Sequence, residues 1–319
     1  MKNLSIYYSV GALLYCPANN ENIFASIVTE KFGNQYSLAL CLEDTIHDDH
    51  VEEAELTMIQ SISKIYEASL SQKFYIPKIF IRVRNAGQIS RLFHALGNSA
   101  ALLCGFILPK FSPDNAEEYI HAIISVNEKS AKPIYAMPIY ESASIIDLRN
   151  RYDILYHLKE KLSEIEELIL NIRVGGNDLC HIFGFRRHDT ESIHQIRPIS
   201  NIFSDIITVY GADYVVSGPV WEYYNGCNWE SGLISEIMDD KLCGFIGKTV
   251  IHPKQISVVN NSYKVFAKDL DDAKAILNWD KTSRTLVSGN VIKERMNEYK
   301  THYNWAIQTI LTAEVFGTK

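Results

Sequence analysis

Apolar residues fall into eight short runs that are mostly continuous. The runs cover residues 7–17, 37–44, 78–85, 101–110, 133–142, 168–176, 213–221 and 244–253. Continuous runs of this length are typical of strands covered on both faces in a parallel sheet, whereas a half-exposed strand alternates apolar and polar residues. The pattern therefore predicts eight parallel strands.

Amphipathic helical patterns lie between these runs. One stripe, spaced i, i+3, i+4, i+7, ends at Gly97 and comprises Ile89, Leu92, Phe93 and Leu96. The clearest stripe ends at Gly211 and comprises Ile199, Ile202, Phe203, Ile206, Ile207 and Tyr210. Eight strands alternating with helices over about 250 residues predict an α/β fold, a (β/α)8 TIM barrel over residues 1–253. An open, doubly wound sheet is the alternative that the pattern allows.

The last part of the chain, residues 254–319, has a different character. It contains no strong strand pattern but an Asp-rich segment (KDLDDAKAILNWDK) and a long helical pattern that runs from Ile292 to Ile310. We expect a helical C-terminal extension that packs on the barrel or on a neighbouring subunit.

Composition narrows the class of protein. The 319 residues are 47% hydrophobic and 22% charged, which suits one large domain or two small ones with an ample core. A net charge of −7 argues against a nucleic-acid partner, which normally requires a basic face. No apolar run approaches the roughly 20 residues of a membrane span, and the N-terminal stretch is expected to be a first strand, not a signal peptide. The six cysteines are scattered without a CxxC pair, so we expect a cytoplasmic protein.

Charged residues stand at the ends of several predicted strands, and a barrel would place all of them around one pocket. The set comprises Glu43, Asp44, Arg82, Arg84, Lys110, Glu141, Asp178, Lys248 and His252. Glu141 and Asp178 each end an apolar run, and about one helix separates the two runs. Two carboxylates at neighbouring strand ends can share Mg²⁺, which is usually held by one or two carboxylates with water and substrate oxygens. An arginine can bind a substrate carboxylate, and the group together would stabilise the enolate formed when a bond next to a carbonyl breaks.

Each of these residues also has a structural interpretation. Glu43 and Asp44 can begin the acidic surface run EDTIHDDHVEE. The two arginines can form ion pairs, Lys110 can be a solvated strand end, and His252 can support a turn before Pro253. Glu141 can belong to a helix cap with Ser142, and Asp178 can be a turn residue after two glycines. No HxxxH or HExxH spacing, GxSxG motif or GxGxxG motif indicates a zinc site, a serine hydrolase or a nucleotide site.

Seven segments, taken in order, resemble the citrate lyase β-subunit-like (CitE-like) family of the HpcH/HpaI aldolase superfamily. They are LLYCPANN, LALCLEDTI, IRVRN, GFILPKF, YES, VGGNDL and GFIGKTVIHPKQI, the last of which follows the pattern GFxGKxxIHPxQI. Any one match is weak, but the ordered set runs from about residue 12 to residue 260. The sequence also looks like a divergent branch of the family that is found beside tellurium-resistance-type proteins.

This resemblance implies a TIM barrel that breaks or forms carbon–carbon bonds with Mg²⁺ as cofactor. Glu141 and Asp178 fall on the metal-ligand positions of the family. Arg82 falls on the arginine that binds the substrate carboxylate, and Glu43 and Asp44 fall on an acidic pair that supports catalysis. We expect Arg84, Lys110 and His252 to join Arg82 in binding substrate, a small oxo- or hydroxyacid or its CoA thioester. Homo-oligomers, often trimers or hexamers, are implied too.

Three departures from the family pattern bear on function. Cys41 stands where the family has an aspartate before its LED motif, which removes one charge near the metal. The Val10–Gly11 region lacks the arginine that often precedes the first strand, which argues against ordinary CoA-phosphate binding. Arg84 stands in place of an asparagine and adds positive charge.

Three functions therefore compete. The first is a Mg²⁺-dependent carbon–carbon lyase or aldolase acting on a small oxo- or hydroxyacid unit. The second keeps the metal but hydrolyses a thioester. The third is a non-catalytic barrel that binds a metabolite or a partner protein in a stress-response assembly, and the departures at Cys41 and at the first strand motivate it.

Overall fold

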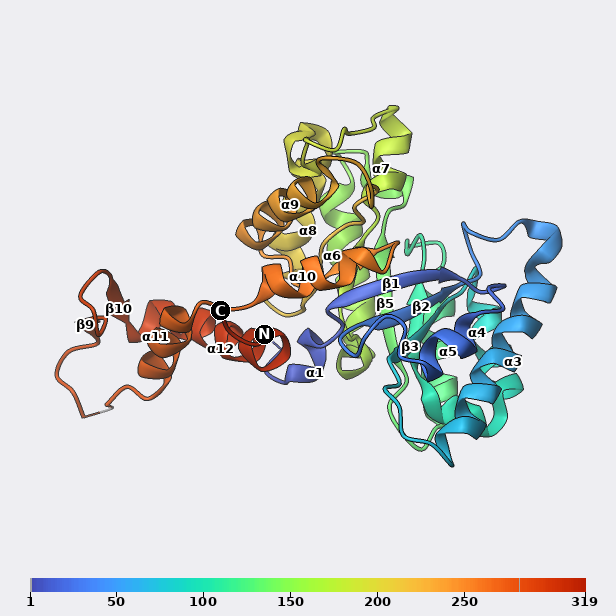
Figure 1. Ribbon diagram of the computed structural model, residues 1–319. Helices are drawn as coiled ribbons and strands as arrows, with labels where there is room; N and C mark the ends of the chain where they lie inside the picture. Colours follow the sequence, from blue (N-terminus) through green and yellow to red (C-terminus); the bar gives the residue numbers. More distant parts are fainter. Residues whose placement is uncertain (1, 281) are drawn as a thin grey trace.

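The computed structural model describes residues 2–280 and 282–319 and shows a barrel of eight parallel strands surrounded by helices (Figure 1). The strands are β1 (Ala12–Pro17), β2 (Ser37–Cys41), β3 (Lys78–Arg82), β4 (Leu103–Leu108), β5 (Tyr135–Tyr140), β6 (Ile172–Val174), β7 (Val216–Ser217) and β8 (Lys248–Val250). Their spatial order is β7-β6-β5-β4-β3-β2-β1-β8, and a parallel bridge from Gly218 to Lys248 joins the two ends. The predicted TIM barrel is confirmed.

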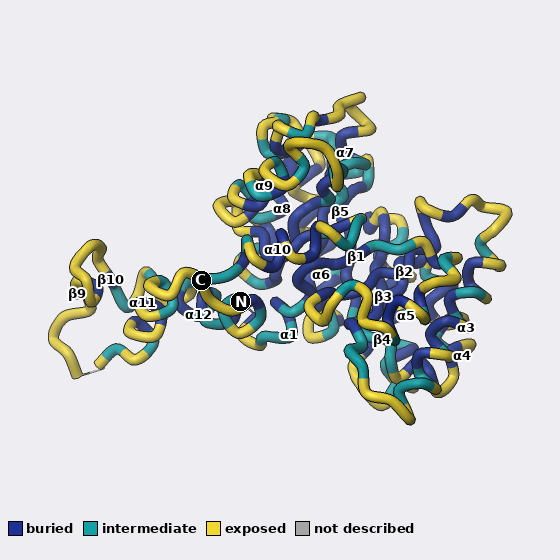
Figure 2. Tube along the Cα trace, in the orientation of Figure 1, coloured by how far each residue is buried: buried dark blue, intermediate teal, exposed yellow. Residues whose placement is uncertain are grey.

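Most residues of the barrel strands are buried, as their continuous apolar runs predicted, and β2, β6 and β7 are buried at every position. The main helices of the outer layer are α3 (Val51–Ser69), α4 (Ala86–Leu96), α5 (Ala116–Asn127), α6 (Arg151–Ser163), α8 (Arg197–Tyr210), α9 (Trp229–Cys243) and α10 (Lys254–Tyr263), with the shorter α2 (Ile23–Val28) and α7 (Gly176–Phe183). Each turns its apolar stripe toward the sheet, and the dark interior in Figure 2 shows this shared core.

The first predicted strand begins later than expected. Residues Ser5–Tyr8 form the short helix α1, and β1 starts only at Ala12. Between them, Gly11 adopts a left-handed conformation with φ of 60°, which a glycine accepts at little cost and which separates helix from strand. The prediction of a strand from residue 7 was therefore wrong for its first part, because hydrophobicity alone does not distinguish one apolar helical turn from a strand.

The C-terminal part is helical, with one addition that the sequence analysis missed. Helices α11 (Ala267–Leu277) and α12 (Tyr299–Phe316) pack on each other, and between them β9 (Val287–Gly289) and β10 (Met296–Glu298) form a small antiparallel hairpin. The helix predicted from Ile292 therefore starts at Tyr299 instead. The Asn290 side chain accepts backbone hydrogen bonds from Glu294 and Arg295 and so closes the hairpin turn.

The C-terminal segment contacts the barrel at its two ends. After β8, α10 packs on β1 and α9, while the end of α12 contacts α1 and α10. The Phe316 ring stacks on the ring of Tyr263, with centroids 5.2 Å apart. The hairpin and α11 project away from the barrel, as Figure 1 shows at the left. In the part of the chain that is described, no helix is both long enough and apolar enough to cross a membrane.

Candidate active site

A cavity of about 250 Å³ opens where the barrel strands end at their carboxyl side. It collects polar side chains from strands that are far apart in sequence. They include Tyr15, Asp44, Arg82, Glu141, Arg173, Asp178 and Thr249. The fold thus brings together four of the residues that the sequence analysis placed at one pocket, namely Asp44, Arg82, Glu141 and Asp178.

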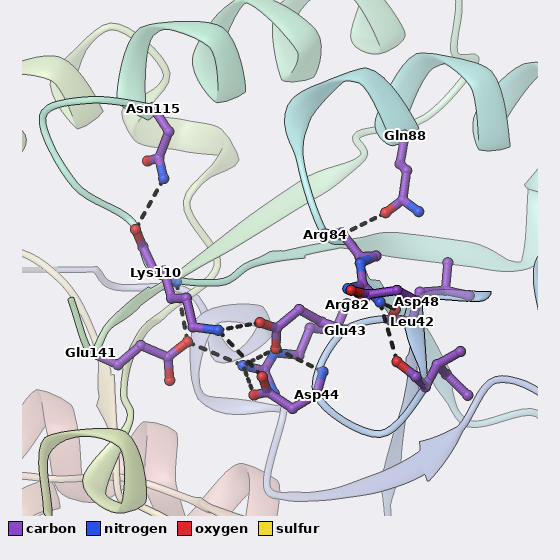
Figure 3. Close-up of polar contacts among 11 residues, drawn as sticks. Leu42, Glu43, Asp44, Asp48, Arg82, Arg84, Gln88, Lys110, Asn115 and Glu141 are labelled. Atoms are coloured by element: carbon purple, nitrogen blue, oxygen red, sulfur yellow. Dashed lines mark hydrogen bonds and ion pairs between the residues drawn. The ribbon is translucent and has the colours of Figure 1, made fainter. Parts of the chain in front are cut away.

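Arg82, the last residue of β3, lies at the centre of a carboxylate cluster. Its Nη2 atom is 2.7 Å from Glu43 Oε2, 2.9 Å from Asp44 Oδ2 and 3.1 Å from Glu141 Oε1 (Figure 3). The side chain is only 9% exposed, so these charge-assisted bonds form in a largely desolvated place. Nη1 makes none of these three contacts, and among the residues that the structure describes the buried Nε has no hydrogen-bond partner.

Lys110 joins the same cluster from the loop after β4. Its Nζ atom is 2.5 Å from Glu43 Oε1 and 3.3 Å from Asp44 Oδ1, and its backbone N–H donates to Glu141 Oε1 at 3.1 Å. The residue has a left-handed φ of 49°, which costs a non-glycine residue about 1–2 kcal/mol. Strain of this kind persists where the surrounding structure fixes the backbone. Here the strained conformation directs the ammonium group of Lys110 toward Glu43 and Asp44 and its backbone N–H toward Glu141.

The cluster separates the acidities of Glu43 and Asp44. Burial raises the pKa of Glu43, and the hydrogen bond with Asp44 raises it further. Burial also disfavours charge on Asp44, but the hydrogen bond with Glu43 and attraction to Arg82 and Lys110 outweigh it and lower its pKa. Neighbouring carboxyls pushed apart in this way can serve different roles, one holding a proton and the other a charge. Glu43 is buried, so it does not begin a solvated surface run.

Glu141 follows β5 and turns its carboxylate into the cavity. Burial raises the pKa of Glu141 to about 8, and the charge of Asp178 contributes to the rise, while Arg82 and the Lys110 N–H oppose it. On the other side the carboxylate touches Gly175, at the end of β6. A Cβ atom on Gly175 would lie 2.0 Å from Glu141 Oε2, so only glycine fits there.

Asp178 lies in the first turn of α7 and lines the cavity beside Glu141. Within residues 2–280 and 282–319, its carboxylate has no hydrogen-bond or ion-pair partner, and no group of three His, Cys, Asp or Glu side chains is arranged to hold a metal. The site offers instead two carboxyl groups: that of Asp178, which has no partner among the described residues, and that of Glu141, whose pKa the charge of Asp178 helps to raise. This donor set fits Mg²⁺, which takes one or two carboxylates and completes its shell with water and substrate oxygens.

Three predicted substrate-binding residues do not line this cavity: Lys110 joins the carboxylate cluster beside it, whereas Arg84 and His252 make contacts elsewhere. The Arg84 guanidinium donates to the carbonyl oxygens of Leu42 and Ile46 and pairs with Asp48, apart from the carboxylate cluster in Figure 3. The His252 ring stacks on Tyr224 at 4.6 Å between centroids. Arg84 leaves the sheet because β3 ends at Arg82 and the Asn85 side chain caps α4. Lys248, also at a predicted strand end, is buried in ion pairs with Glu236 and Asp240.

Among the cavity residues that were missed from the sequence, three polar ones lie within strands: Tyr15 on β1, Arg173 on β6 and Thr249 on β8. Polar side chains were expected at the ends of strands, where chain direction alone places them around the pocket. One signal was present, since Arg173 is a single charge inside an otherwise apolar run. A charge there is costly unless it faces a polar interior.

A closed α/β barrel with an acidic cavity at the carboxyl ends of its strands defines the class of the (β/α)8 barrel enzymes. The family of carbon–carbon bond lyases of the TIM-barrel fold matches residues 4–318, and the chain belongs to this family. No curated protein matches the chain in sequence.

Solved structures share the fold at low sequence identity. The protein CitE from Mycobacterium tuberculosis, in complex with magnesium, acetoacetate and coenzyme A, is 18% identical over 97% of this chain and 99% of its own, with a TM-score of 0.60. A citrate lyase from Burkholderia xenovorans LB400 is 13% identical over 97% of this chain and 93% of its own, with a TM-score of 0.69. The citrate lyase β subunit from M. tuberculosis, complexed with oxaloacetate and magnesium, is 19% identical over 82% of this chain and 99% of its own, with a TM-score of 0.54.

Proposed function

We propose that this protein is a Mg²⁺-dependent carbon–carbon lyase or aldolase whose substrate is a small oxo- or hydroxyacid, free or as a CoA thioester. The observation that carries the proposal is that two carboxyl groups, those of Glu141 and Asp178, lie side by side in a cavity that also contains Arg82. Membership of the carbon–carbon lyase family supports the reaction class. Solved relatives in complex with magnesium and with oxaloacetate or acetoacetate support the cofactor and the acid.

Glu141 and Asp178 would hold Mg²⁺, which when bound supplies the positive charge that stabilises an enolate. Arg82 would bind and orient the substrate carboxylate through Nη1, while its Nη2 keeps Glu43 and Asp44 in place. In the cleavage direction a substrate hydroxyl loses its proton, the adjacent carbon–carbon bond breaks, and the electron pair passes to the carbonyl-bearing fragment as an enolate. Glu43, with its raised pKa, lies beside Lys110 and is placed to hold a proton during this exchange.

One observation favours a second candidate, a barrel that binds an acid metabolite without turning it over. Cys41, at the end of β2, is fully buried and is aligned with Arg82 on the neighbouring strand. It therefore supplies no carboxylate where the resembling family has one. This candidate predicts Mg²⁺-dependent binding of acids without turnover of any member of a broad substrate panel, whereas the lyase predicts products with a broken carbon skeleton.

The test is calorimetric titration of Mg²⁺, with and without pyruvate, oxaloacetate or glyoxylate, into wild type and Asp178→Ala. We expect Mg²⁺ to bind wild type, an oxoacid to tighten this binding, and Asp178→Ala to lose it. Asp147→Ala is the matched control, because Asp147 also follows β5 but forms its ion pair with the exposed Arg149 and does not line the cavity. If wild type binds no Mg²⁺ with any of these acids, the proposed function is wrong.

We also propose that the protein is cytoplasmic and assembles as a homo-oligomer, a trimer or a hexamer. The hairpin after α11 exposes apolar side chains, among them Val291, Ile292 and Met296. Such a projecting apolar surface is typical of a subunit contact. Sedimentation velocity of the full chain gives the oligomeric state, and a monomer at micromolar concentration would contradict this part of the proposal.

A further inference from the structure

Arg173 is a buried cation inside the barrel to which the proposed mechanism gives no role. It is the middle residue of β6, is aligned with Ile139 on β5, and lines the cavity together with that residue. Its side chain is buried, with 2% of the residue exposed. An arginine stays charged even in such a place, so its charge must be balanced by its surroundings.

The side chains around Arg173 do not supply a negative charge to balance its guanidinium. The Nη2 group donates to Thr249 Oγ1 at 2.5 Å, but the buried Nη1 has no hydrogen-bond partner among the residues that the structure describes. Within the described part of the chain, no carboxylate lies at ion-pair distance from Arg173. Arg82, in the same cavity, has three. An unpaired charge in a protein interior is strongly destabilising, and natural proteins retain one mainly where it serves a ligand.

The neighbours of Arg173 also point to an anion. Burial lowers the pKa of Arg173, attraction to Tyr15 and a hydrogen bond with its hydroxyl oppose this, and the positive charge of Arg82 lowers it further. The ring of Tyr15 lies 5.8 Å from the Arg82 guanidinium carbon, and burial raises the pKa of its phenol, which therefore remains a neutral hydroxyl donor. Arg173, Tyr15 and Thr249 thus place donors around one part of the cavity, whereas Glu141 and Asp178 place acceptors in another.

We infer that Arg173 binds a second carboxylate of the substrate, so that the cavity selects acids with two carboxylates over acids with one. The inference rests on the proposed function for the other end of the substrate, which Arg82 and the metal pair would hold. A carboxylate suits the free edge of the guanidinium because it accepts two parallel N–H bonds. The small volume of about 250 Å³ leaves room for a short diacid.

The experiment compares acids that differ by one carboxylate. Calorimetry in the presence of Mg²⁺ measures pyruvate against oxaloacetate and 2-oxobutyrate against 2-oxoglutarate. We expect wild type to bind the better-fitting diacid about ten- to a hundredfold more tightly than its monoacid partner, as a charge-assisted contact allows. Arg173→Met should lose this preference and keep the monoacid affinity, and Arg173→Lys should retain part of it.

Controls separate this role from a structural one. Arg149→Met removes an exposed arginine outside the cavity and should leave the preference unchanged. Thermal unfolding shows whether Arg173→Met folds; removing an unpaired buried charge should raise its midpoint. If that variant does not fold, Thr249→Val provides the test, because it removes the Nη2 partner while keeping the shape of the side chain. It should then shift the preference and leave monoacid binding intact.

The outcomes also distinguish this inference from the proposed function. Malonate and acetate are titrated without metal, so that Arg173 can be tested even if no acid shows Mg²⁺-dependent binding. Tighter binding of malonate that Arg173→Met abolishes supports the inference whatever the metal does. Equal affinities for diacid and monoacid in wild type, or an unchanged preference in Arg173→Met, would overturn it.

Discussion

Gly175 lies directly against the Glu141 carboxylate, and a methyl group on its Cα would sit 2.0 Å from Oε2 and 2.3 Å from the Glu141 Cβ. The residue after β6 therefore fixes the position of the side chain that follows β5. Asp178 follows three residues later, at the start of α7, so one short segment places one candidate metal ligand and holds the other.

The first prediction concerns this contact. Gly175→Ala should displace the Glu141 side chain and weaken Mg²⁺ binding by at least about tenfold, because metal sites tolerate little displacement of their ligands. Calorimetry measures the Mg²⁺ affinity. Gly184→Ala is the control, because an added Cβ on Gly184 would have no neighbour within 4 Å among the described residues. Since Gly184 has φ of 70°, that control should lose stability but keep its affinity for Mg²⁺. Unchanged Mg²⁺ affinity in Gly175→Ala would show that Glu141 is not a ligand.

The second prediction concerns pH. With its pKa raised to about 8, Glu141 is mostly protonated at neutral pH, and Mg²⁺ must displace that proton. The apparent Mg²⁺ affinity should therefore rise with pH, by up to about tenfold per unit below pH 8, and level off above it. About one proton should be released per ion bound at pH 7, which calorimetry in buffers of different ionisation enthalpy measures. An affinity that is constant from pH 6.5 to 8.5 would contradict the prediction.

The third prediction concerns the left-handed backbone of Lys110. Lys110→Gly and Lys110→Ala both remove the ammonium group, but only glycine relieves the φ of 49°. The glycine variant should therefore be more stable than the alanine variant by about 1 kcal/mol. Urea unfolding measures the two free energies of unfolding, and an alanine variant at least as stable as the glycine variant would refute the assigned strain.

The sequence predicted the barrel because its strands are continuous apolar runs, and continuous runs follow from burial on both faces. It predicted the acids and Arg82 because the carboxyl ends of barrel strands meet on one face. The sequence did not show that Arg84 lies outside the cavity. Strand β3 ends at Arg82 because Asn85 caps the following helix, and the length of the apolar run does not reveal this end. Arg173 was missed from the sequence. The pairing of β6 with β5 and β7 decides which of its side chains point into the barrel, and this pairing cannot be read from the sequence of β6 alone. The hairpin of β9 and β10 was missed because its strands are short and largely exposed.

The last prediction concerns Arg82 as the charge that holds three acids together. Arg82→Met should destabilise the fold by about 3–5 kcal/mol at neutral pH, because it leaves Glu141 without its cation and leaves Glu43 and Asp44 with Lys110 alone. Those carboxyls would then bind protons in the folded state with raised pKa values, while in the unfolded chain they would titrate near pH 4. Since the folded state would hold more protons, stability should fall as pH rises, and the loss should be smaller at pH 5.5 than at pH 8. Urea unfolding at the two pH values measures this. Arg91→Met, which breaks an ion pair with Glu55 outside the cavity, is the control. An Arg82 variant that is equally destabilised at both pH values would mean that packing of the arginine stem, and not its charge, stabilises this part of the barrel.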